Sequence, residues 1–226
     1  RLDLVVIAHD RDTVTLLLQD EHGRFDADRK RTIPTGQRSP PHTHDVTVAD
    51  VNGDGKLDVL TSNEDDCSVS VLLGDGAGGF RAARGSPFAA GQHPYEGLSV
   101  GDVNGDNKLD IVVPNIQGKA VTVLLGDGAG AFAPAPGSPL AVGDRPGFVT
   151  LGNLTSFAKK LDIVVTHDDE TTVHVWCGDG RGGFRPAPGS PLQVRENVWG
   201  AVVADMNADG TNDLVLGAKR GHVLIF

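Results

Sequence analysis

The chain has 226 residues, of which 39% are hydrophobic and 5% aromatic, enough apolar material for one domain or one compact array of repeats. Its 30 glycines and 13 prolines predict frequent turns and short strands, which excludes a helical bundle or a coiled coil. Because the formal net charge is -10 and no apolar run approaches the roughly 20 residues of a membrane span, we expect no nucleic-acid partner and no membrane insertion.

One pattern recurs along the chain with a period of about 52 residues. An apolar strand runs into an acidic loop, as in residues 46–58, and a second strand follows at once. The pattern returns at 98–113 and 201–216, and a degraded copy lies at 149–165. The repeats divide one domain, residues 1–226, into five units of approximately 1–40, 41–92, 93–144, 145–195 and 196–226.

Each complete unit predicts four short antiparallel strands. A Gly-rich turn such as residues 73–80 follows the third strand, and a Gly-Ser-Pro connection leads from the fourth strand to the next unit. Four strands per repeat are typical of a β-propeller blade, so we predict an all-β propeller with incomplete terminal units. The residue count favours a trimmed five-bladed ring, and the alternative is a fragment of a larger ring.

The acidic loops have the composition of calcium sites. Side-chain oxygens occupy positions 1, 3, 5 and 9, a backbone carbonyl is free at position 7, and oxygen-only ligands on a tight loop suit Ca²⁺. An EF-hand is excluded, because its twelfth position is a Glu followed by a helix, whereas here that position falls in a predicted strand. Three sites are expected, with the ligands Asp50, Asn52, Asp54, Lys56 and Asp58; Asp102, Asn104, Asp106, Lys108 and Asp110; and Asp205, Asn207, Asp209, Thr211 and Asp213.

The loop of the fourth unit departs from this pattern. It starts at Asn153, is one residue longer, carries Phe157 at the fifth position and places Lys159 and Lys160 beside it. We therefore predict that this loop binds no metal.

The intact loops and the strands around them resemble FG-GAP or VCBS repeats, similar to those of integrin α-subunit propellers and of many secreted bacterial proteins. The resemblance implies a propeller with Ca²⁺ between the first and second strands of a blade. Relatives of this kind include adhesion modules, sugar-binding lectins and a few lyases. Since such loops suit extracellular calcium concentrations, we expect a secreted, periplasmic or cell-surface protein, with Cys67 and Cys177 unpaired.

Strand direction places two sets of loops on the face opposite the calcium loops. The loops between units surround the mouth of the central channel, and the loops between second and third strands add His9, Asp10 and the segments 63–66, 167–170 and 219–220. The candidate ligand-binding residues of this face are His42, His44, His93, Tyr95, Glu96, Arg145 and Trp199.

Two functions fit these residues. We favour a non-catalytic recognition module for a carbohydrate or a protein, in which Trp199 and Tyr95 provide stacking platforms and no residue is catalytic. The alternative is a metal-dependent lyase or hydrolase, in which His42, His44 and His93, together with Glu96 or Asp45, hold a transition metal at the channel.

Overall fold

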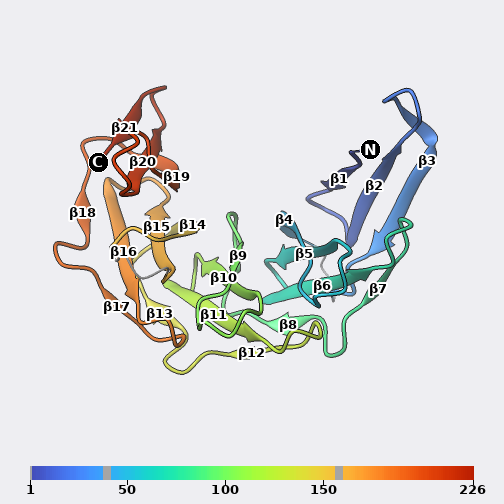
Figure 1. Cartoon of the computed structure of the whole chain (residues 1–226), viewed down its shortest axis with the longest axis horizontal. Coiled ribbons are helices and arrows are strands. Elements are labelled where there is room, and N and C mark those ends of the chain that lie inside the picture. Colours follow the sequence, from blue (N-terminus) through green and yellow to red (C-terminus); the bar gives the residue numbers. More distant parts are fainter. Residues whose placement is uncertain (1, 38–41, 156–159) are drawn as a thin grey trace.

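The computed structural model describes residues 2–37, 42–155 and 160–226, which form five antiparallel sheets in chain order. The sheets follow one another along an open arc, with the first and last sheets at its two ends (Figure 1). The all-β propeller fold is therefore confirmed, but the five sheets do not close the ring that the residue count favoured. A repeat length fixes the size of a blade, whereas the packing between neighbouring blades fixes the angle between them.

The three middle sheets share one plan. Three strands form a meander, and the outer fourth strand is split into two short pieces that both pair with the third strand. The strands are β4 (Thr43–Ala49), β5 (Asp58–Asn63), β6 (Ser68–Gly74), β7 (Phe80–Ala82) and β8 (Phe88–Ala89); β9 (Ser99–Gly101), β10 (Asp110–Asn115), β11 (Ala120–Gly126), β12 (Phe132–Pro134) and β13 (Leu140–Ala141); and β14 (Pro146–Gly152), β15 (Asp162–His167), β16 (Thr172–Gly178), β17 (Phe184–Pro186) and β18 (Leu192–Gln193).

The terminal sheets have three strands each. The first comprises β1 (Leu4–Ile7), β2 (Thr13–Gln19) and β3 (Phe25–Pro34), and the last comprises β19 (Val198–Ala204), β20 (Asp213–Ala218) and β21 (Val223–Ile225). Strands β4, β9, β14 and β19 line the inside of the arc (Figure 1). No helix long and apolar enough to cross a bilayer occurs in the described part of the chain.

The Gly-Ser-Pro segments lie inside the outer strand, between its two pieces, and not between one unit and the next as predicted. The hydroxyl of Ser86 accepts a hydrogen bond from the backbone N–H of Val71 at 2.9 Å. Ser138 and Ser190 do the same in the next two sheets. Each serine thus satisfies a backbone donor of the third strand where the outer strand is interrupted.

The hydrophobic core consists of layers between neighbouring sheets. The layers between the second and third, third and fourth, and fourth and fifth sheets contain valine, leucine and isoleucine side chains that are almost wholly buried. The layer between the first two sheets is smaller, with only Val14, Val59 and Leu72 fully buried among the described residues. Strands β5, β10 and β15 are buried along their whole length, because they lie between two such layers.

Candidate functional site

The first acidic loop joins β4 to β5 and folds around its own side-chain oxygens. The carboxylate of Asp50 accepts hydrogen bonds from the N–H groups of Asp54 and Gly55, at 3.1 and 2.8 Å. The side-chain oxygen of Asn52 accepts a second bond from Asp54 N–H. The turn needs a left-handed backbone, which Gly53 and Gly55 supply with φ of 70° and 81°.

The other two intact loops repeat this geometry. Asp102 accepts from the N–H of Asn107 at 2.8 Å, and Asp205 accepts from the N–H of Gly210 at 2.9 Å. Asn107 has a φ of 63°, so asparagine takes the left-handed position that glycine holds elsewhere. The first, third and fifth positions of all three loops therefore offer only oxygen donors on one tight turn, which fits a hard cation such as Ca²⁺.

The aspartate at the ninth position also has a structural role. Asp58 is fully buried, and its two oxygens accept hydrogen bonds from the N–H groups of Val51 and Gly74, at 2.9 and 2.8 Å. Asp110 repeats both bonds in the next sheet. Burial raises the pKa of Asp58, and the nearby carboxylates of Asp54 and Asp50 raise it further. A cation in the loop would relieve that repulsion.

Part of the fourth loop, including Phe157 and Lys159, lies outside the described residues. In the described part, Asp162 accepts hydrogen bonds from the backbone N–H groups of Leu154 and Thr155 and from the Thr155 hydroxyl. In the first two loops, by contrast, the corresponding Asp58 and Asp110 accept only from backbone N–H groups among the described residues.

A cluster of histidines around one glutamate lies on the opposite side of the sheets. We call His9, His42, His44, His93 and Glu64 the His–Glu cluster. His44 Nε2 donates to Glu64 Oε2 at 2.5 Å, and His93 Nδ1 donates to Glu64 Oε1 at 3.0 Å. His42 Nδ1 lies 3.0 Å from Glu64 Oε2. Three histidines from two units thus surround one carboxylate, and His9, from the first unit, lies against the rings of His42 and His44.

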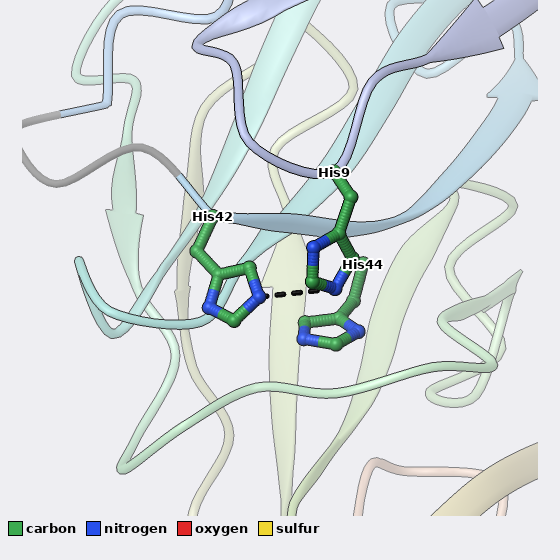
Figure 2. Close-up of side chains that lie close together, drawn as sticks. All are labelled: His9, His42 and His44. Carbon is green, nitrogen blue, oxygen red and sulfur yellow. Dashed lines mark hydrogen bonds between the residues drawn. The ribbon is translucent and has the colours of Figure 1, made fainter.

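Three of these rings also lie against one another (Figure 2). The Nε2 atoms of His9 and His42 are 3.0 Å apart, and the ligand nitrogens of His9, His42 and His44 all lie within 4.8 Å of one another. Among the described residues, this is the only group of three histidine, cysteine or acidic side chains whose ligand atoms lie so close together.

Backbone hydrogen bonds between the first two sheets position the His–Glu cluster. His9 follows β1, and its carbonyl accepts from the N–H of Thr43, between His42 and His44. The carbonyl of His42 accepts from the N–H of Glu64, which directly follows β5. The buried hydroxyl of Thr43 accepts from the Gln37 amide at 2.8 Å. These contacts fix the backbone from which the imidazoles project.

Two members of this cluster, His44 and Glu64, have shifted pKa values. Burial lowers the pKa of His44, and the neighbouring Glu64 only partly offsets that effect. Burial alone raises the pKa of Glu64, but the hydrogen bonds from His93 and His44 outweigh it, so the pKa is lower than usual. Tyr95 packs against His44 with ring centroids 4.4 Å apart, and burial raises the pKa of its hydroxyl.

A second group lies on the same face, at the fourth and fifth sheets; we call Arg145, Asp168, Trp199 and Lys219 the Trp–Asp cluster. Arg145 Nη2 donates to Asp168 Oδ2 at 2.7 Å, and Lys219 Nζ donates to Asp168 Oδ1 at 3.1 Å. The same ammonium lies 4.5 Å from the centroid of the ring of Trp199, a residue that is 51% exposed. Tyr95 and Phe148 line a small pocket together with Asp168 and Trp199.

The structure groups the predicted face residues differently from the sequence interpretation. His42, His44 and His93 each lie against Glu64, and His9, not His93, lies beside the rings of the other two. Glu64 supplies the carboxylate, not Asp45, whose oxygens accept from the N–H groups of Val46 and Leu98 and so join two blades. Glu96 makes no hydrogen bond to these histidines, and burial raises its pKa.

Arg145 and Trp199 meet through Asp168 and Lys219. The sequence placed His9, Glu64, Asp168 and Lys219 on this face but did not single them out. The feature of the sequence that could have identified these four residues is their position in loops between second and third strands. Strand direction brings those loops to the same side as the entry loops.

Comparisons with known proteins agree with this fold. The FG-GAP-like repeat profile matches residues 1–61, 50–113 and 159–216. A comparison with curated proteins found no match to the chain.

Among solved structures, the crystal structure of BBS1N in complex with ARL6DN, soaked with mercury, has a TM-score of 0.62 and 14% identity over 99% of this chain. The alignment spans 61% of that BBS1N chain. A Photorhabdus luminescens Tc holotoxin pore (mutation TccC3-D651A) aligns with a TM-score of 0.40 and 16% identity over 99% of this chain and 13% of that one, too low to carry an argument. The BBS1N likeness supports the propeller fold alone.

Proposed function

The chain belongs to the FG-GAP-like repeat family, and we propose that it is a β-propeller binding module whose ligand docks on the face that carries the His–Glu and Trp–Asp clusters. The observation that carries the proposal is the Trp–Asp cluster. It combines a half-exposed indole with an ion-paired arginine, aspartate and lysine on one face. Tryptophan and arginine dominate the binding energy of many protein interfaces, so this composition suits a recognition surface.

A protein ligand fits this face better than a carbohydrate. A sugar ring binds tryptophan by stacking on a face of the indole, and the Lys219 ammonium already covers one face of Trp199. A protein surface can instead contact the exposed edge of the indole and pair with the charges around it. The BBS1N propeller, which was crystallised in complex with ARL6DN, offers a precedent at the level of the fold.

The binding test uses variants of the face and a matched control away from it. Proteins cross-linked to the full chain are identified, and each is titrated against the wild type, Trp199→Ala and Tyr95→Ala. Arg181→Ala, in the exposed turn between β16 and β17, is the control. We expect Trp199→Ala to weaken binding by about 30-fold, in line with an interface hot spot of about 2 kcal/mol. Unchanged affinity of both face variants, with unchanged melting temperature, would refute the proposal. Glycan-array binding lost in Trp199→Ala would instead make the ligand a carbohydrate.

We also propose that Ca²⁺ binds the three intact loops through the oxygens of their first, third and fifth positions, with the seventh carbonyl and the ninth aspartate completing the donor set. The ion would supply positive charge among converging carboxylates and thereby stabilise the turn between the first two strands of a blade. Calorimetric titration of chelator-treated protein should count three sites. A count of none or four would contradict the assignment.

The proposed calcium sites also indicate in which compartment the protein functions. Calcium modules outside the cell function with affinities of roughly 10⁻⁴–10⁻³ M, so loops of this kind suit a secreted, periplasmic or cell-surface protein.

A further inference from the structure

The Nε2 atoms of His9 and His42 face each other, and each ring has its Nδ1 beside a carboxylate. His9 Nδ1 donates to Asp10 Oδ1 at 3.2 Å, and His42 Nδ1 lies 3.0 Å from Glu64 Oε2. A neutral imidazole that carries its proton on Nδ1 has a bare lone pair on Nε2. The two Nε2 atoms nevertheless face each other at 3.0 Å (Figure 2). With both rings protonated on Nδ1, either an additional proton or a cation lies between the two Nε2 atoms.

The third ring completes a set of ligands. His44 donates from Nε2 to Glu64, which leaves its Nδ1 as the nitrogen available for coordination. All three histidines thus place one nitrogen against a carboxylate, which is how metal-binding histidines are usually oriented by their surroundings. Tetrahedral coordination at about 2.0–2.1 Å separates ligand nitrogens by about 3.4 Å. The His9 and His42 nitrogens, 3.0 Å apart, need only a small adjustment to reach that separation, and the ligand nitrogens of all three rings lie within 4.8 Å of one another.

We propose that His9, His42 and His44 form a binding site for one divalent transition-metal ion of the zinc class, and that Glu64 orients two of the three imidazoles. Three nitrogen ligands suit zinc-class ions, whereas the oxygen donors of the acidic loops suit Ca²⁺, so the two kinds of site select different metals. Carboxylates of Asp10, Glu64 and Asp65 around the rings favour a cation electrostatically.

The site has an accessible side. The side chain of His44 is only 7% exposed, whereas those of His42 and His9 are 26% and 57% exposed. An ion can therefore enter from the solvent side and keep a fourth position for water or for a group of a bound ligand. Because His9 follows β1 and His42 precedes β4, the ion would also cross-link the first two sheets.

The test uses the full chain, stripped with chelator and then kept in excess CaCl₂ so that the acidic loops cannot take up the added metal. Calorimetric titration with ZnCl₂ should give one site per chain, and Co²⁺ should produce the visible absorption of tetrahedral coordination. His9→Ala and His42→Ala should each weaken Zn²⁺ binding by at least about 100-fold, and Glu64→Gln by about 10- to 100-fold. His22→Ala, which removes an exposed histidine from the turn between β2 and β3, is the matched control and should bind as the wild type does.

Two results would overturn the proposal. One is the absence of stoichiometric Zn²⁺ binding, which would mean that an additional proton alone holds the histidines together. The other is binding that His9→Ala and His42→Ala leave unchanged. Both replaced side chains are partly exposed, and melting curves of the metal-free variants in CaCl₂ verify that they are folded.

Discussion

Replacing Gly74 with alanine tests how the acidic loop is attached to its blade. Gly74 ends β6, and a methyl group added there would lie 2.2 Å from the carbonyl oxygen of Leu57, whereas ordinary contacts begin at 3.4 Å. The carbonyl belongs to the backbone just before Asp58, so no side-chain rotation can relieve the clash. The same N–H of Gly74 donates to the buried carboxylate of Asp58 at 2.8 Å.

The expected loss of stability follows from these two contacts. The backbone must move by about 1 Å, and overpacking of this kind typically costs 1–3 kcal/mol. A movement of that size also stretches a hydrogen bond to a buried carboxylate, which costs a further 1–3 kcal/mol if the bond is lost. We expect a total of about 3 kcal/mol, or a decrease in Tm of roughly 6–12 °C for a chain of this length.

Thermal unfolding followed by circular dichroism, in calcium and in chelator, measures this effect. The control is Gly200→Ala in β19, where no atom of the described residues lies within 4 Å of the added methyl group and φ is not left-handed. The control should keep or slightly raise its Tm, because alanine restricts the unfolded chain. If Gly74→Ala melted within about 2 °C of the wild type, the close approach of β6 to the acidic loop would not be required for folding.

Asp54→Ala should lower Tm in calcium and leave it nearly unchanged in chelator, as followed by differential scanning fluorimetry, because its exposed carboxylate would act through the ion; equal losses in both would count against calcium binding. Burial and the adjacent His167 lower the pKa of His174 from 6.5, so the unfolded chain takes up a proton first as pH falls. The stability that His174 contributes is therefore present above about pH 6.5 and decreases below it, and urea midpoints at several pH values should show a weaker pH dependence in His174→Gln. Ser86→Ala leaves the N–H of Val71 without its acceptor and should lower the free energy of unfolding by about 1–3 kcal/mol, whereas an unchanged urea midpoint would show that water replaces the hydroxyl.

Much of the fold could be predicted from the sequence, because the determinants lie within one repeat. The acidic loop, the strand from Asp58 and the Gly-rich turn recur with their hydrogen bonds, so one unit predicts the others. The place of Ser86 was not predictable in this way, since Gly-Ser-Pro forms equally well in a linker and in an interrupted strand. The curvature of the arc was also not predictable, because it depends on side chains that meet between units.

The sequence predicted which loops form the ligand face, but it did not predict which of their side chains contact one another. Strand direction places His9 and Glu64 on the same side as His42, but it does not say which side chains touch. The contact between His9 and His42 depends on how the first two sheets pack, and the contact between Trp199 and Lys219 depends on the path of the last one. Neither distance is encoded in a repeat period.

The hydrophobic layers between neighbouring sheets differ in size, which implies that the sheets do not all separate and unfold with equal ease. Each sheet depends on its neighbours, so local opening should begin where the shared layer is smallest. That layer joins the first two sheets, where Val14, Val59 and Leu72 are the fully buried members. Amide protons of β2 should therefore exchange with solvent through sub-global openings, well before those of β10 at the centre of the arc. The first sheet is the part of the molecule that can separate without unfolding the rest.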